Sequence, residues 1–479
     1  MEINFTPLLP AAEVILTAIT VLLLDLVLRE EEKGLLLWIT VLGLGGAAGM
    51  GFLLWGSQEG AFQDSYLLDG FSLFFSQFFV GVALVTVLSS AHYLRETRIR
   101  QGEYYALILF STFGMILMAS ANDLILFFLG LETMSIAVYV LTGMWRERSE
   151  ASEAAMKYFI IGAFATGFLL YGIALIFGAT GSANLSRIAA SLVKPANPLP
   201  LFFYAGIFLL LIGLAFKVAA VPFHFWVPDV YDGAPTPVSG FMAVGVKAAA
   251  FAGWARIFLS QLSPLQSEWT FPLWVLAILT MTLGNLLAIT QSSVKRMLAY
   301  SSIAHAGYLL IGLVAGDESG GQALLFYLLT YAPMTLGAFG VVMALKKEDK
   351  NYEAYGDYAG LGFKRPFLGM AMSLFMLSLA GFPPLGGFTG KFYLFRSAVV
   401  SGYTSLAVIG VLNSLLSVIY YLRVIVMMYM EEGGVEGKSF ATAPYLYAAI
   451  AIGVVGTVYL GLLPASALDL SRLAFLSLR

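Results

Sequence analysis

The sequence contains no cysteine and only three histidines in 479 residues. The absence of cysteine excludes disulfides, thiolate-bound iron-sulfur clusters and cysteine-type zinc sites in this chain. Three histidines are too few for a typical multi-haem protein. We therefore expect no cofactor and no metal to be bound by this chain.

Charged residues are also scarce. They make up 11% of the chain, whereas 59% is hydrophobic and the mean hydropathy is +0.85. Ordinary soluble domains contain about 25% charged residues, so a water-soluble globular protein is excluded and the solvent must be lipid. The net charge of -3 is small and dispersed, which favours neither nucleic acid nor an acidic tail.

Long apolar windows fill the chain. About 20 apolar residues are needed to cross a hydrocarbon core of about 30 Å. No Lys or Arg precedes Arg29, so we interpret the first window as a permanent helix and not as a cleaved leader. The sequence predicts an all-α polytopic membrane protein, a single membrane domain over residues 1–479. Its windows lie at 7–28, 34–55, 70–92, 103–121, 123–143, 153–178, 200–231, 236–258, 271–291, 299–315, 320–345, 366–402, 404–429 and 443–464.

The basic residues in the connections predict the orientation, because cytoplasmic loops are enriched in Lys and Arg. One side is predicted to hold only five of these residues, Arg187, Lys194, Arg256, Arg472 and Arg479, and the other side fifteen. The poorer side is therefore the outer one, which places both termini outside, with the even-numbered helices running from inside to outside. The richer, inner side holds Arg29, Lys33, Arg95, Arg98, Arg100, Arg146, Arg148, Lys295, Arg296, Lys346, Lys347, Lys350, Lys364, Arg365 and Lys438.

Two windows are interrupted. The seventh contains Pro222 and Pro228 within apolar sequence, and the twelfth is broken over residues 381–387. Broken backbone at bilayer depth is tolerated only where protein or a watery cavity satisfies the freed polar groups. Helices 4–8 and 9–13 form two blocks of five with a break in the fourth helix of each, and because five is odd the second block must be inverted. The alternative is that both breaks are ordinary proline kinks.

Ionisable residues within the windows are the candidate site, since a charge at the centre of a helix costs about 2.5–3.5 kcal/mol on insertion scales. Burial lowers the pKa of a lysine in general and a nearby carboxylate raises it, so a change in their separation loads or unloads a proton. The candidates for a proton relay are Glu132, Lys217, Lys247, Lys391, His224 and His305.

Each candidate has a plainer interpretation. Glu132 and Lys217 could form a static pair that fixes helix packing, and the two other lysines could extend to an interface. The histidines could be satisfied packing residues. Lys157, at the start of the sixth window, could modulate Glu132 or anchor the inner surface.

Two long runs, at residues 217–238 and 293–308, together with Glu132 and the Gly390-Lys391-Phe392 segment, resemble the antiporter-like subunits of respiratory complex I, the proton-pumping NADH-quinone oxidoreductase. The resemblance covers roughly residues 100–430. It implies fourteen helices, two inverted five-helix repeats and broken helices 7 and 12. The corresponding segments are 1–100 for helices 1–3, 101–260 and 261–430 for the repeats, and 431–479 for helix 14 and the tail.

The same resemblance implies roles and partners. Glu132 and Lys217 form the charge pair, Lys247 is the central relay, His305 connects the half-channels and Lys391 lies on the outlet side. NAD, FMN, iron-sulfur clusters and quinone are bound by partner subunits, and the chain lies in the cell inner membrane beside other antiporter-like subunits. Among those subunits, Lys391 in helix 12 argues against the type that typically has a glutamate there, and the lack of a long lateral helix argues against the extended type. Alternatives are a multi-subunit sodium/proton antiporter, a related membrane-bound hydrogenase or ferredoxin-driven complex, and a passive scaffold.

Overall fold

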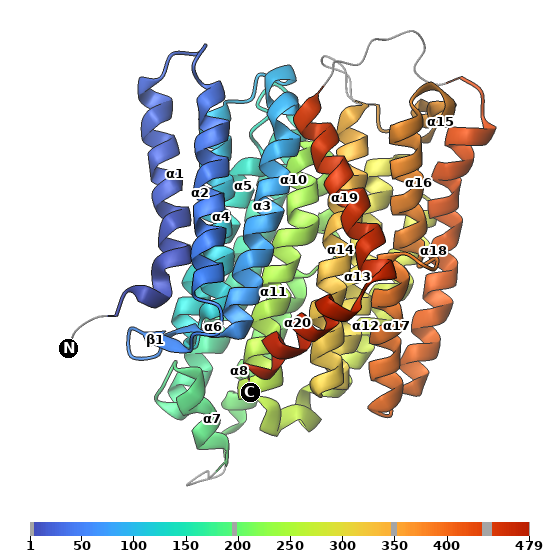
Figure 1. Cartoon of the computed structure of the whole chain (residues 1–479). Helices are drawn as coiled ribbons and strands as arrows, with labels where there is room; N and C mark the ends of the chain where they lie inside the picture. Colours follow the sequence, from blue (N-terminus) through green and yellow to red (C-terminus); the bar gives the residue numbers. More distant parts are fainter. Residues whose placement is uncertain (1–3, 194–198, 346–351, 434–442, 479) are drawn as a thin grey trace.

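The structure, a computed structural model, describes residues 4–193, 199–345, 352–433 and 443–478. Figure 1 shows a bundle of long, roughly parallel helices with the N- and C-termini at the same end. The first half contains α1 (Leu9–Val27), α2 (Gly34–Leu53), the hairpin of β1 (Glu59–Ala61) and β2 (Tyr66–Leu68), α3 (Gly70–Glu96), α4 (Gln101–Ser120), α5 (Leu124–Thr142), α6 (Ser149–Thr180), α7 (Leu185–Val193), α8 (Leu201–Lys217), α9 (Trp226–Gly233), α10 (Thr236–Phe241) and α11 (Lys247–Trp254).

The second half is equally helical. It contains α12 (Gln266–Ile289), α13 (Val294–Ala315), α14 (Glu318–Ala344), α15 (Leu361–Lys364), α16 (Pro366–Ala380), α17 (Gly386–Val400), α18 (Thr404–Met430), α19 (Pro444–Leu462) and α20 (Ala465–Leu476). Short 3-10 turns lie at Thr6–Leu8, Ser263–Leu265 and Tyr355–Tyr358.

Twelve helical stretches within the described ranges are long and apolar enough to cross a membrane. Large apolar side chains cover their outer surface; Leu53 is 86% and Phe164 71% exposed. A surface of this kind is stable in lipid and not in water. The prediction of a polytopic, all-α membrane protein is confirmed.

Both interrupted windows are broken where the sequence predicts. α8 ends at Lys217 and α9 begins at Trp226, with Pro222 between them. α16 ends at Ala380, and the following residue, Gly381, has a φ of 93°, a left-handed conformation that glycine adopts readily and that terminates the helix. α17 begins at Gly386. Proline removes a backbone donor and glycine permits the left-handed cap, so each break is encoded locally.

The eighth window is less regular than a plain span. α10 and α11 are joined by the π-helical segment η2 (Met242–Val246), and a second π-helical segment, η3 (Ala255–Gln261), follows α11. π-helical turns are rare and are frequent at functional sites. Lys247 begins the short α-helix between the two segments.

Small residues allow close helix contacts. A Cβ atom at Gly114 of α4 would lie 2.5 Å from the backbone nitrogen of Met134 in α5. Gly43 of α2 has the same role against Thr17 of α1, where a Cβ would lie 2.1 Å from the threonine hydroxyl. These glycines pack helices in the manner of small-residue membrane interfaces.

The C-terminal tail, for which the sequence predicts no helix, contains α20. Figure 1 shows α20 lying across the bundle at a steep angle to the other helices. Gln322 of α14 donates to the backbone oxygen of Leu468 at 3.0 Å, and Arg472 pairs with Glu318 at 2.7 Å. The tail is therefore docked on α14.

Candidate functional site

Lys217 is the last residue of α8 and is 4% exposed. Its Nζ atom donates to the Ser135 hydroxyl at 2.8 Å and to the Tyr139 hydroxyl at 3.2 Å, both on α5. Glu132 lies one turn before Ser135 on the same helix, and its Oε1 atom is buried without a hydrogen bond to another described residue. Lys217 thus contacts the helix that carries Glu132 through hydroxyl groups, and no direct ion pair between the two forms in the described part of the chain.

Lys247 is 3% exposed and lies between the two π-helical segments. Its Nζ atom donates to the hydroxyl of Ser302 at 2.5 Å and to the backbone oxygen of the same residue. The Tyr331 ring lies 5.9 Å from Nζ. Lys247, which belongs to the first half of the chain, therefore contacts α13 and α14 of the second half.

His305 occupies α13 one turn beyond Ser302 and is 1% exposed. Its Nδ1 atom lies 2.6 Å from the Tyr327 hydroxyl and its Nε2 atom 3.0 Å from the Tyr421 hydroxyl. Tyr421 also shares a hydrogen bond with the Ser301 hydroxyl. A neutral imidazole donates from one nitrogen and accepts at the other, so His305 joins α14 to α18 through groups that exchange protons.

Lys391 follows the second break and is 3% exposed. Its Nζ atom donates to the backbone oxygens of Leu379 and Ala380 at 2.9 and 3.1 Å and to the Ser414 hydroxyl at 2.9 Å. A cation at these freed carbonyls is stabilised by the C-terminal end of α16. The ring of Tyr308, on α13, lies 4.8 Å from Nζ.

Helix α13 brings these groups together. Ser301, Ser302, His305 and Tyr308 recur at spacings of three and four residues and share one face. Lys247 contacts this face at Ser302 and Lys391 contacts it at Tyr308. The result is a buried row of amines, hydroxyls and an imidazole in an otherwise apolar interior, which is chemically suited to passing protons.

A family model described as "NADH:quinone oxidoreductase/Mrp antiporter, TM" matches residues 121–417. NADH-quinone oxidoreductase subunit N of Trichlorobacter lovleyi is 45% identical over 472 residues, which cover 98% of this chain and 97% of that protein. The chain belongs to the subunit N family of NADH-quinone oxidoreductases. A chain in the structure of respiratory complex I from Thermus thermophilus matches with a TM-score of 0.82 and 38% identity over 96% of this chain and 98% of its own length.

The Mrp complex of Dietzia contains a chain with the same fold, with a TM-score of 0.85 over 99% of this chain and 97% of that one. Its sequence identity is 22%, so this likeness concerns the fold alone. Within the shared fold, the much higher identity to members of the subunit N family separates this chain from the sodium/proton antiporter alternative.

The two remaining sequence candidates lie apart from the row on α13. His224 lies in the first break, half-buried, and its Nδ1 atom makes no hydrogen bond with the described residues. Lys157 is 42% exposed and pairs with Glu153 at 2.7 Å and Asp229 at 3.1 Å. These contacts favour an anchoring role for Lys157 at the end of the bundle over a contact with Glu132.

Sequence reasoning missed a buried ion pair in this family member. Arg256, expected in an outer loop, lies in η3 and is 2% exposed. Its terminal nitrogens bind both oxygens of Asp69 at 2.9 and 3.0 Å, and its Nε atom donates to the backbone oxygen of Ala119 at 2.7 Å. The sequence contained one signal of this burial, an arginine within the apolar run 251–259. Its partner Asp69 lies far upstream, where its side chain caps α3 by accepting from the backbone nitrogen of Ser72.

Lys295, also expected in a loop, is fully buried at the start of α13. Its Nζ atom donates to the backbone oxygens of Asp232 and Ala234, each at 2.9 Å, and lies 3.4 Å from a carboxylate oxygen of Glu353. It therefore ties the end of α9 to α13. Of the other loop residues used for the orientation, Lys194, Lys346, Lys347, Lys350, Lys438 and Arg479 lie outside the described residues.

Proposed function

We propose that this chain moves protons across the membrane as a subunit of NADH-quinone oxidoreductase, driven by redox chemistry in other subunits. The observation that carries the proposal is the buried polar row on α13, which Lys247 contacts at Ser302 and Lys391 at Tyr308. Buried amines and an imidazole are costly in an apolar interior, and in membrane proteins they mark ion and proton paths. The related proteins are named as subunits of NADH-quinone oxidoreductase and respiratory complex I. NADH oxidation needs redox groups, which the proposal places in other subunits.

In this proposal, Glu132 and Lys217 load the relay from the first half of the chain. Ser135 and Tyr139 hold Lys217 close to the helix of Glu132, so a small displacement of α8 against α5 changes the separation of the two charges. Lys247 is the central relay, His305 carries protons between Tyr327 and Tyr421, and Lys391 is the last donor. His224 and Lys157 are given supporting roles in this proposal, because both lie apart from the row on α13.

We further propose fourteen crossings built from two inverted repeats, helices 4–8 and 9–13, with crossings 7 and 12 broken. The twelve continuous candidate spans support this count, as do the two shorter apolar helices that precede the breaks, Leu201–Lys217 and Pro366–Ala380. A lysine ends the helix before the first break and another follows the second. The segments 101–260 and 261–430 would then be the repeats, preceded by 1–100 and followed by 431–479.

The environment follows from the family. The chain is proposed to lie in the cell inner membrane, with both termini on the outer side and other complex I membrane-arm subunits, including antiporter-like ones, beside it. Both termini lie at one end of the bundle in Figure 1, as this orientation requires. Iron-sulfur clusters are assigned to partner subunits, because the chain has no cysteine to bind one. NAD, FMN and quinone are assigned to partner subunits by the family resemblance.

The test uses the intact complex reconstituted in proteoliposomes, with NADH oxidation and proton uptake measured together. Lys217→Ala and Lys247→Ala are expected to lower the number of protons moved per electron, because the proton-carrying groups are lost while the redox subunits remain. Lys364→Ala, at an exposed lysine of α15, is the matched control. A complex that assembles with both relay substitutions and still pumps at full stoichiometry would make the chain a scaffold.

A further inference from the structure

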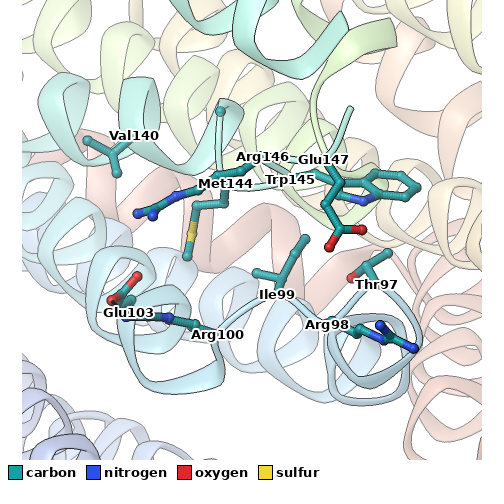
Figure 2. A pocket seen from close by; sticks show the side chains of 11 residues that line it. Thr97, Arg98, Ile99, Arg100, Glu103, Val140, Met144, Trp145, Arg146 and Glu147 are labelled. Carbon is teal, nitrogen blue, oxygen red and sulfur yellow. Dashed lines mark hydrogen bonds and ion pairs between the residues drawn. The ribbon is translucent and has the colours of Figure 1, made fainter. Parts of the chain in front are cut away.

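A pocket of about 220 Å³ lies at the end of the bundle opposite the termini, away from the row on α13. The turn between α3 and α4 forms one wall, and the last turn of α5 with the following loop forms the other. Figure 2 shows the two walls facing each other, with Met144 and Arg146 on one and Ile99 and Arg100 on the other. The proposed proton path does not use any of these residues.

Three arginines line the pocket. Arg100 is paired with Glu103 at 3.0 Å. The side chains of Arg98 and Arg146 make no ion pair or hydrogen bond with other residues in the described ranges, and both are exposed. Glu147 also lines the pocket, so the lining has three positive and two negative groups and retains a net positive charge.

The backbone also presents one of these arginines in an unusual way. Arg98 has a φ of 53°, in the left-handed region that non-glycine residues seldom adopt. This conformation ends α3 and turns the chain back toward α4. Figure 2 shows the Arg98 and Arg146 side chains on opposite walls of the pocket, and neither forms an ion pair within the described residues. Each guanidinium group is able to bind a phosphate oxygen pair in a bidentate manner.

The edge of the pocket is apolar and leads into the membrane. Val140, at the rim, is 51% exposed, and Ile136 and Leu129 on the same face of α5 are 56% and 52% exposed. Their spacing of four and seven residues forms one continuous stripe along the helix. A ligand that fits both features has an anionic head at the helix end and hydrocarbon chains that follow α5.

We propose that this pocket binds the phosphate headgroup of an anionic phospholipid, with its acyl chains lying on the exposed face of α5. Basic pockets between membrane helices on the positively charged side of a membrane are suited to such headgroups.

The test titrates the delipidated intact complex with dioleoyl-phosphatidylglycerol, dioleoyl-phosphatidylcholine or sodium phosphate and counts the bound molecules by native mass spectrometry. We expect Arg98→Gln/Arg146→Gln to weaken one phosphatidylglycerol site about 30-fold, which corresponds to about 2 kcal/mol for two arginines near the membrane surface. Arg98→Lys/Arg146→Lys keeps both charges and loses only the bidentate geometry, so it is expected to weaken binding less than the glutamine variant does. Arg29→Gln, at an exposed arginine of the same end, is expected to leave the site unchanged.

Four results would overturn the proposal. In the first, the glutamine double variant binds phosphatidylglycerol as tightly as the unsubstituted complex. In the second, phosphatidylcholine binds equally well, so charge is not recognised. In the third, sodium phosphate alone fills the site at the same concentration as the lipid, which makes it a free-anion site. In the fourth, the unsubstituted complex binds no lipid there because a neighbouring subunit covers the pocket.

Discussion

The buried pair of Asp69 and Arg256 permits a quantitative prediction. Asp69→Asn keeps a side-chain oxygen that accepts from the backbone nitrogen of Ser72 and so keeps the cap of α3, but it removes the negative charge opposite the guanidinium. Arg256 would then be a buried cation held mainly by the Ala119 oxygen. Breaking one partner of a buried ion pair costs about 3–5 kcal/mol. Asp69→Ala also removes the cap, which adds about 1 kcal/mol.

The assay takes advantage of the absence of cysteine. Ala250→Cys, at a fully buried position of α11, introduces a single thiol beside η3, and a fluorogenic maleimide reports when that thiol is exposed. Denaturant titrations of the full chain in mild detergent then give the free energy of unfolding for each variant in this background. The expected order of stability is the cysteine background first, Asp69→Asn second and Asp69→Ala last.

A double variant tests the same physical argument from the opposite direction. Asp69→Leu/Arg256→Met replaces both charges by apolar groups, and such replacements of buried pairs are often neutral or stabilising. We expect the double variant to be more stable than either single one. The reasoning fails if Asp69→Asn lowers the free energy of unfolding by less than about 1 kcal/mol, or if the two single effects simply add in the double variant.

Three further predictions follow from single contacts. Ser414→Ala removes one of the three oxygens that accept hydrogen bonds from Lys391, and a hydrogen bond to a charged group is worth about 1.5–3 kcal/mol. We expect this variant to lower the number of protons moved per electron by the reconstituted complex. An unchanged ratio would contradict the prediction. Lys295→Met leaves two backbone carbonyls at the end of α9 without their hydrogen-bond donor, so amide hydrogen exchange in α9 should accelerate. Unchanged exchange would show that Lys295 does not stabilise the end of α9 against α13. Gly114→Leu drives a side chain into the backbone of α5 and is expected to abolish assembly, as judged by native gels, whereas Gly45→Leu, with no neighbour within 4 Å of its Cβ position, is the tolerated control.

The helices and their two breaks could be predicted because their causes are local. A run of about 20 apolar residues is sufficient to identify a membrane helix. Proline and glycine at residues 222 and 381 interrupt the backbone wherever the surrounding helices lie. The docked helix α20 was missed since its 12 residues are shorter than a span and its stability depends on contacts with α14.

The partners of the buried charges were harder to predict. Membrane helices such as α5 are apolar on every side, so their sequence does not indicate which face meets which neighbour. In place of the predicted ion pair with Glu132, Lys217 donates to the hydroxyls of Ser135 and Tyr139, one and two turns further along α5. Arg256 shows the same difficulty, because its partner Asp69 is 187 residues away along the chain.

The polar row on α13 could be predicted in part, because its spacing is local and its contacts with the two lysines are not. Ser302, His305 and Tyr308 recur at intervals of three residues, and this spacing alone places them on one helical face. The sequence therefore contained the order of these polar groups, although only His305 was identified from its chemistry. The sequence did not contain the approach of Lys247 and Lys391 to the two ends of that row, because it depends on the π-helical segments around Lys247 and on the break before Lys391. Irregular backbone on two other helices thus brings two buried lysines to the periodic polar pattern on α13.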